Sequence, residues 1–173
     1  TEHVNAIHRY TNGYDWIWRV DADEIAPEGM VAEMIRQAQE PGRMANRYRV
    51  PFVHAWRCFS RACRDGSHPI RLENLKWESE WEATITLDSL NGKWEVWHGG
   101  YCQEDKYIRY KLEISGHRPE WRQNWYEERW KANAHQDVHP VCFPGHWNSE
   151  PYDKNLLPEA LKSHPYFQRA IVE

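Results

Sequence analysis

The clearest pattern along the chain is an apolar, aromatic run that stops abruptly on acidic residues. Residues 14–20 are rich in aromatic and β-branched side chains, and Asp21, Asp23 and Glu24 follow them. Such residues favour strands, and near-continuous apolarity is typical of a strand buried on both faces at the centre of an α/β sheet. The pattern therefore predicts a strand that delivers carboxylates to an open edge of a sheet.

A helix is predicted after the acids. Pro27 stands where a first helical position would be, and Glu28 suits the positive end of the helix dipole. Apolar residues then recur at helical spacing until Pro41-Gly42 ends the pattern. These apolar positions are Met30, Val31, Met34, Ile35 and Ala38.

The rest of the chain predicts short strands and helices. Strands are expected over 47–56, 69–72, 83–87 and 93–98, a loop over 57–68, and helices over 103–115, 121–133, 158–162 and 165–172. Pro51 indicates an edge or a bulge in the first of these strands. Asn91-Gly92 separates the last two strands and is a strong signal for a β-hairpin.

These elements indicate the α/β class, with a mixed sheet, flanking helices and a hairpin. A chain of 173 residues favours one domain. We expect residues 1–116 to form this domain. Residues 117–173, which are rich in Pro and Trp, are expected to pack on it as an irregular helical extension.

Composition and charge argue against several classes of protein. The formal net charge is −4, so no basic field attracts nucleic acid or anionic lipid. No apolar run approaches the roughly 18 residues of a membrane span, and the first residues show no signal-peptide pattern. Cys58, Cys63, Cys102 and Cys142 include no Cys-x-x-Cys pair. This spacing argues against a zinc site and favours reduced thiols in a cytoplasmic protein.

Aromatic residues are unusually abundant, with 11 Trp and 9 Tyr. Each such ring offers a large rigid face with one polar group. The rings either stack on sugars or bases, or they build an aromatic core in a chain poor in Leu and Ile. We favour the core for most of them.

The acidic end of the first strand has several chemical interpretations. At a strand end, Asp21 and Asp23 can converge on one ion, and two carboxylates with open positions suit Mg²⁺ or Mn²⁺. A phosphatase of the haloacid-dehalogenase type also places Asp-x-Asp after an apolar strand and would use Asp21 as its nucleophile. The later Gly-Asp-x-x-x-Asp loop of such enzymes is absent from this sequence. A third interpretation is that the acids cap the following helix and stay solvated.

Further elements follow the acidic strand in a particular order. They are an Arg-Leu strand at Ile70-Arg71-Leu72, an acidic pair at Trp81-Glu82, a His-x-Gly-Tyr-like element at Trp97-His98-Gly99-Gly100-Tyr101, and a basic helix around Ile108–Lys111. With Trp16–Glu24, this set resembles the later part of a glycosyltransferase with the GT-A fold, close to glycosyltransferase family 2. The similarity spans residues 10–115.

This resemblance implies transfer of a sugar from a nucleotide-diphosphate sugar to a carbohydrate or other hydroxyl acceptor, with inversion. It implies Mn²⁺ or Mg²⁺ bound through Asp23, with His98 as a later ligand and Asp21 on the ribose or the metal. A carboxylate would act as general base for the acceptor, with Glu82 as the first candidate and Glu80 as the second. Candidates for the diphosphate are Lys106, Arg109 and Lys111, and candidates for stacking on sugars are Trp77, Trp81 and Trp97.

The resemblance also bears on the completeness of the site. In the GT-A fold, strand–helix units before the Asp-x-Asp hold the nucleotide base, and here about 13 residues precede the first strand. Either the chain is a fragment, or a second chain supplies that half, or the fold is reduced. Beside the transferase and the phosphatase, a non-catalytic carbohydrate-binding or scaffold subunit therefore stays open.

Overall fold

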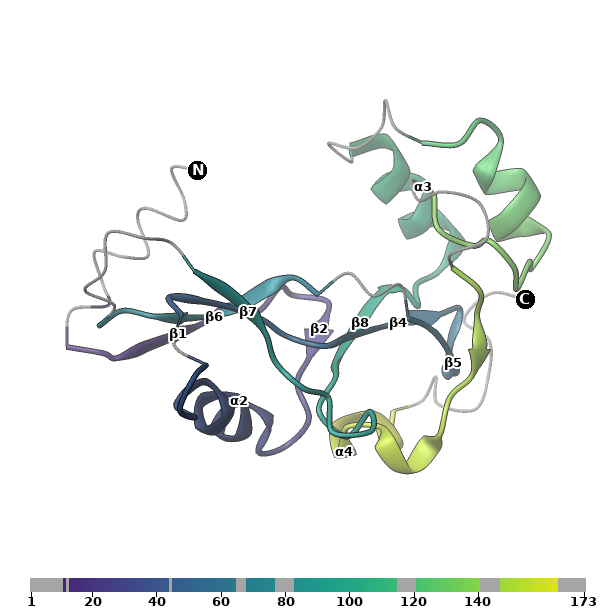
Figure 1. The fold of residues 1–173 in the computed structure, drawn as a ribbon. Helices are drawn as coiled ribbons and strands as arrows, with labels where there is room; N and C mark the ends of the chain where they lie inside the picture. The colour runs from purple at the N-terminus through teal and green to yellow at the C-terminus, as the bar shows by residue number, and fades with distance from the viewer. Residues whose placement is uncertain are drawn as a thin grey trace.

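The structure is a computed structural model that describes residues 11, 13–43, 45–64, 68–76, 83–114, 121–140 and 147–164. Its strands form two mixed sheets accompanied by few helices, which confirms the α/β class (Figure 1). The strands are β1 (Trp16–Trp18), β2 (Glu24–Ile25), β3 (Arg47–Arg49), β4 (Phe52–Trp56), β5 (Cys58–Cys63), β6 (Ile70–Asn74), β7 (Thr84–Thr86), β8 (Val96–Tyr101) and β9 (Glu150–Pro151). The helices are α2 (Met30–Ala38), α3 (Asp105–Ile114), the π-helix η2 (Tyr126–Lys131), the 3₁₀-helix η3 (Lys154–Leu156) and α4 (Glu159–Lys162). No described helix is long and apolar enough to cross a lipid bilayer.

The first sheet has the strand order β1-β6-β3-β7. β6 pairs antiparallel with β1 and with β3, and β3 pairs parallel with β7. β1, β3 and β7 therefore run in one direction, and their carboxyl ends meet at the edge of the sheet where Asp21 follows β1. In the described part of the chain β1 pairs with β6 only, so the predicted central strand is an edge strand, with Ile17 buried and Trp16 and Trp18 half-buried.

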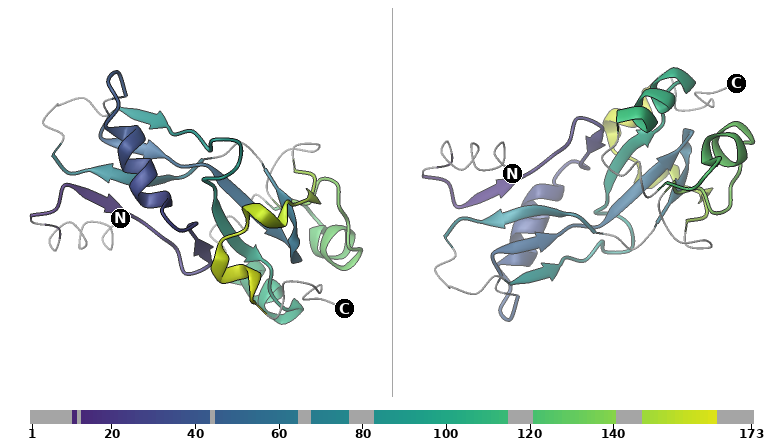
Figure 2. Two further views of the ribbon diagram at one scale, coloured as in Figure 1. Left: turned by 90° about the horizontal axis from the view of Figure 1, so that it is seen from below. Right: turned by 90° about the horizontal axis from the view of Figure 1, so that it is seen from above.

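Helix α2 covers one face of the first sheet (Figures 1 and 2). Met30, Met34 and Ala38 recur one turn apart and therefore share one face of the helix. They pack in one buried cluster with Tyr48 and Leu72 of the sheet. The helix predicted after the acids is thus confirmed, although it begins at Met30, after Gly29, and not at Pro27. Its packing anchors the segment that carries the acids.

Pro51 divides the run that was expected to form one strand over 47–56. β3 ends at Arg49 in the first sheet, and β4 begins at Phe52 in the second. Because proline has no N–H to donate to a ladder, it suits the point where the chain leaves one sheet for the other. The second sheet has the order β2-β8-β4-β5-β9, in which β4 and β8 are parallel and the other neighbours antiparallel.

Two predictions about this region were wrong. The segment expected to be a loop over 57–68 contains β5, which pairs with β4. The expected hairpin does not form, since β7 pairs with β3 while β8 pairs with β4 and β2. A turn with positive φ at Leu90, Asn91 and Gly92 is present, but it joins strands of different sheets.

The C-terminal residues complete the second sheet and its cores. β9 pairs with β5, and Leu157 and Leu161 pack in one buried cluster with Trp97. Another cluster contains Trp56, Trp125, Trp130 and Trp147, each no more than 3% exposed. The described part of residues 117–173 therefore shares the cores of the sheet, and the helix expected over 121–133 is reduced to η2. The helix expected over 165–172 lies outside the described residues.

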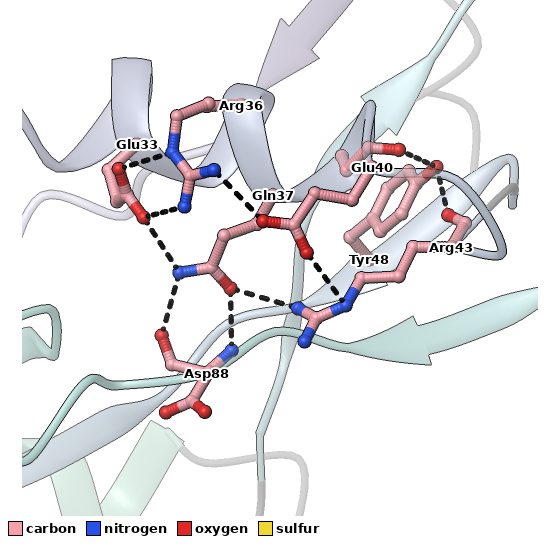
Figure 3. Close-up of polar contacts among 8 residues, drawn as sticks. Glu33, Arg36, Gln37, Glu40, Arg43, Tyr48 and Asp88 are labelled. Carbon is pink, nitrogen blue, oxygen red and sulfur yellow. Dashed lines mark hydrogen bonds and ion pairs between the residues drawn. The ribbon is translucent and has the colours of Figure 1, made fainter.

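A polar network ties α2 to the loop after β7 (Figure 3). Gln37 lies at its centre and is 2% exposed. Its Nε2 donates to Glu33 Oε1 (3.2 Å) and to the carbonyl of Asp88 (3.1 Å), and its Oε1 accepts from Asp88 N–H (2.9 Å) and from Arg43 (3.2 Å). One buried amide thus satisfies both backbone groups of Asp88 and fixes the helix against the carboxyl end of β7.

Replacing Gln37 with Ala is expected to lower the free energy of unfolding by about 1–3 kcal/mol, because it removes a buried amide that bonds both backbone groups of Asp88. Urea unfolding followed by tryptophan fluorescence measures this loss. Gln39→Ala is the matched control, since Gln39 is exposed at the end of the same helix. It should change the free energy by no more than about 0.5 kcal/mol. Equal effects of the two substitutions would argue against the network.

Candidate functional site

The acidic residues carry the chain from the first sheet into the second. β1 ends at Trp18, and Glu24 begins β2, which pairs antiparallel with β8. In this register Glu24 lies opposite His98, so the acidic segment and the His-Gly-Gly element are neighbours through backbone pairing. The N–H of Gly99 donates to the carbonyl of Asp23 at 2.6 Å and holds this residue at the end of the ladder.

Glu24, Arg71 and Asp21 form a chain of ion pairs that runs from the interior to the surface. The side chains of Glu24, Arg71 and Asp21 are 1%, 17% and 68% exposed. Arg71 donates hydrogen bonds to the Glu24 carboxylate from Nε (2.9 Å) and from a terminal nitrogen. It also donates to Asp21 Oδ2 at 2.7 Å. The N–H of Asp21 also donates to Glu24 Oε2 at 3.1 Å. The buried carboxylate of Glu24 therefore stabilises the acidic turn over residues 21–24, while the side chain of Asp21 remains largely in solvent.

Asp23 lies between a histidine and a lysine. Its Oδ2 is 3.3 Å from His98 Nε2 and 3.6 Å from Lys111 Nζ. The hydrogen bond with His98 holds the pKa of Asp23 well below its usual range, and Coulomb attraction to His98 and Lys111 adds to this effect against the opposing effect of burial. Asp23 therefore presents an ionised oxygen beside an imidazole nitrogen at neutral pH.

Gly100 makes room for this cluster. A Cβ atom at this position would collide with Lys111 Nζ and would lie 2.6 Å from Cε1 of His98. Lys111 Nζ also donates to the carbonyl of Gly100 at 3.4 Å and lies 5.1 Å from the ring centre of Tyr101. The missing side chain thus lets α3 bring its lysine against the histidine of β8.

His54 of β4 lies against His98 within the second sheet. β4 and β8 pair in a register that places the two residues side by side. Their Nδ1 atoms are 2.8 Å apart, and their ring planes are nearly perpendicular at 84°. Trp147 packs on His54 with ring centroids 4.5 Å apart. Reasoning from the sequence missed His54, because a single histidine in an apolar strand gives no local signal.

The pair Asp23 and His98 fits a divalent cation in donor type and spacing. Two ligand atoms about 2.1 Å from one ion lie about 3 Å apart when the angle between them is near 90°, and the two donor atoms here are 3.3 Å apart. Within the described ranges, no group of three or more His, Cys, Asp or Glu side chains is placed to hold a metal ion. The described residues would thus supply two ligands, and water or phosphate oxygens could supply others, as is usual for Mg²⁺.

Other predicted site residues lie away from Asp23. Arg109 donates to Asp105 (3.0 Å) and to the hydroxyl of Tyr126 (2.8 Å). Lys106 pairs with Glu104 at 2.8 Å. Both cations are more than half exposed and take part in surface ion pairs of α3, so Lys111 is the member of this basic helix that reaches the site.

The predicted base candidates, Glu80 and Glu82, lie outside the described residues, as do Trp77 and Trp81. The described residues on either side of this segment are Lys76 and Ala83. Lys76 pairs with Asp15 at 2.6 Å, and the N–H of Ala83 donates to Asn46 at 2.8 Å. These flanks therefore lie at the end of the first sheet where β1 and β3 begin.

A pocket of about 350 Å³ opens beside Asp23. Asp23 and Gly99 line its polar side, and Phe59, Trp97 and Leu161 line its apolar side. Its volume lies at the lower end of the range of about 300–1,000 Å³ typical of small-molecule sites. Trp97 is only 1% exposed, so its ring contributes to the wall and offers little free face for stacking. A ligand held at Asp23 thus has an apolar surface next to it.

Comparisons with known proteins leave the site to be interpreted from its own geometry. The chain matches no protein-family profile, no curated protein and no solved structure. The residues that bear on its function are therefore those that meet beside the pairing of β2 with β8.

Proposed function

We propose that this protein is a metal-dependent glycosyltransferase with a GT-A-like arrangement. It would transfer a sugar from a nucleotide-diphosphate sugar to a hydroxyl acceptor, with inversion at the anomeric carbon. The observation that carries the proposal is the convergence of Asp23, His98 and Lys111 where the chain passes from the carboxyl end of β1 into the second sheet. Ligands of open α/β sheets bind outside the carboxyl ends of the strands.

Each of these side chains has a role suited to a charged donor. Asp23 and His98 are the residues that would hold the cation, and the imidazole favours Mn²⁺ over Mg²⁺, which prefers oxygen ligands. A bound divalent cation stabilises a diphosphate as it leaves. Lys111 would pair with a phosphate oxygen through a charge-assisted hydrogen bond. Asp21, which Arg71 holds in place, remains exposed and can accept a hydrogen bond from a ribose hydroxyl.

The acceptor half of the reaction rests on the family resemblance. A carboxylate must take the proton of the attacking hydroxyl, and the resemblance offers Glu82, then Glu80, as the bases. The described neighbours of this segment, Lys76 and Ala83, lie at the end of the first sheet opposite Asp21, so this role requires the segment to reach across to the acceptor. The pocket beside Asp23 offers space for a ring next to the diphosphate. The apolar wall formed by Phe59 and Leu161 suits the less polar face of a sugar or of its aglycone.

The decisive experiment measures binding and hydrolysis of a panel of nucleotide-diphosphate sugars by the full chain, with and without Mn²⁺. Metal-dependent binding of one nucleotide sugar supports the proposal. Hydrolysis of simple phosphate esters without preference for a nucleotide would instead favour a phosphatase with Asp21 as nucleophile. An intact fold that binds neither cation nor nucleotide would overturn the proposal and leave a non-catalytic carbohydrate-binding or scaffold subunit.

Gly100→Ala is expected to weaken Mn²⁺ binding by about 10-fold or more, because the new methyl group must displace both Lys111 and the ring of His98. Gly99→Ala is the matched control. Its Cβ would meet the carbonyl of Asp23 at 3.4 Å, an ordinary contact, so the affinity should stay close to that of the wild type. Isothermal titration with Mn²⁺ measures both. Equal affinities for the two variants would contradict the crowded geometry at Gly100.

A further inference from the structure

The contact between His54 and His98 has a consequence for the candidate metal ligand. A neutral imidazole carries one N–H, so its two nitrogens are one donor and one acceptor. The two Nδ1 atoms are 2.8 Å apart, which is a hydrogen-bond distance that holds one proton. If His98 donates this proton, its Nε2 keeps a lone pair. If His54 donates it, the proton of His98 is on Nε2 and points at Asp23, 3.3 Å away.

We propose that His54 is a positioning residue that accepts the Nδ1–H of His98 and thereby presents the Nε2 lone pair of His98 to a divalent cation. This inference rests on the proposed function, because it assigns a role toward the same cation. Metal-bound histidines are usually held by a hydrogen bond on their other ring nitrogen, which fixes both tautomer and orientation. Carboxylates and carbonyls can only accept this proton, whereas histidine can either donate or accept it. His54 can therefore bond Nδ1 of His98 in both states. It accepts the proton of His98 when a cation lies at Nε2, and it donates its own proton when Nε2 of His98 is protonated.

The surroundings of His54 suit a positioning role. Trp147 packs on its ring at 4.5 Å, and Phe52 lies 5.6 Å away in an edge contact. Phe52 also contacts the ring of His98 at 5.9 Å. Because the parallel pairing of β4 and β8 sets both backbones, the two imidazoles are held from the strands and from the aromatic neighbours at once.

The test compares two substitutions at position 54. His54→Leu removes the hydrogen-bonding atom. His54→Asn keeps a polar atom at that place, because the side-chain oxygen and nitrogen of asparagine are bonded to Cγ, as Nδ1 of histidine is. Free Mn²⁺ measured by electron paramagnetic resonance gives the affinity. His54→Leu should bind about 10–100-fold more weakly, the usual cost of losing an outer partner of a metal ligand. His54→Asn should recover most of this loss.

His139→Leu is the matched control. His139 packs on the same Trp147, with ring centroids 3.9 Å apart, but the contact with His98 Nδ1 is made by His54. It should leave the Mn²⁺ affinity unchanged. Losses of equal size in His54→Leu and His139→Leu would show a general packing effect and would overturn the inference, as would full affinity in His54→Leu.

Nitrogen-15 spectra of the histidine rings give a readout that does not depend on activity. Spectra recorded at about pH 8, above the ordinary histidine pKa, with Zn²⁺ as a diamagnetic probe should show His98 protonated on Nδ1 in the wild type. The signal of that protonated nitrogen should be lost or shifted in His54→Leu and retained in His54→Asn. If the wild type binds no Mn²⁺ and no Zn²⁺, the proposed function and the inference both fail. Tight binding that ignores His54 overturns the inference only.

Discussion

Asp23→Asn is expected to abolish Mn²⁺-dependent binding of the nucleotide sugar and to leave the fold intact. The amide has the size of the carboxylate but lacks its charge, so the ion would lose its anionic ligand beside His98. Loss of a direct ligand should exceed the roughly 10- to 100-fold that outer partners of metal ligands cost. Titration with Mn²⁺ gives the affinity, and turnover of the donor found in the panel gives the activity.

The control for this substitution is Asp15→Asn. Asp15 stands before the same strand, is 51% exposed on its side chain and pairs with Lys76 at the surface. Its removal should change neither Mn²⁺ affinity nor turnover. Full metal-dependent activity of Asp23→Asn would sink the proposed site, and a comparable loss in Asp15→Asn would point to a general effect of surface charge.

The features that the sequence predicts correctly are those that depend on one helix or one strand alone. The spacing of Met30 and Met34 places apolar side chains on one face of a helix wherever that helix packs, and α2 is found where it was expected. The helix expected over 103–115 is likewise present as α3. The first strand before Asp21 is also present, but β1 covers only Trp16–Trp18 of the predicted residues 14–20.

The choice of strand partners could not be read from the same patterns. A turn is present at Asn91-Gly92, but the strands on either side of it do not pair with each other. β7 pairs with β3 and β8 pairs with β4, and both partners are distant in the sequence. A short strand has few local contacts that specify its neighbour, so pairing depends on the packing of the whole sheet. Pro51, in contrast, marks in the sequence the place where one apolar run divides into two strands.

The site could be predicted only as far as it lies in recognisable motifs. Asp23 and His98 were proposed together from a family resemblance, and the structure places their side chains in contact. Glu24 became buried because β2 pairs with β8, and His54 met His98 because β4 also pairs with β8. Both contacts follow from strand register, which no local feature of those residues reveals.

Arg71→Met is expected to lower the free energy of unfolding by about 3–5 kcal/mol, the usual cost of leaving one member of a buried ion pair without its partner. The Glu24 side chain is 1% exposed, and Arg71 is its guanidinium partner. Methionine keeps much of the apolar stem of Arg71, but it loses the contact of the guanidinium carbon with the ring of Phe52, 5.5 Å away. Urea unfolding measures the loss, with Arg109→Met as the control on α3. The Arg109 side chain is 55% exposed and pairs with Asp105 at the surface, so its removal should leave the unfolding midpoint nearly unchanged.

The double variant Glu24→Gln/Arg71→Met tests whether the loss comes from the charge. A neutral amide in place of the carboxylate removes the uncompensated buried charge and still offers an oxygen to the N–H of Asp21. The double variant should therefore be more stable than Arg71→Met, although it carries one more substitution. A double variant as unstable as Arg71→Met would assign the loss to packing around Phe52. If the charge is the cause, the ion pair of Glu24 and Arg71 stabilises the acidic turn over residues 21–24. This turn carries the backbone from the first sheet to the second and places Asp23 beside His98.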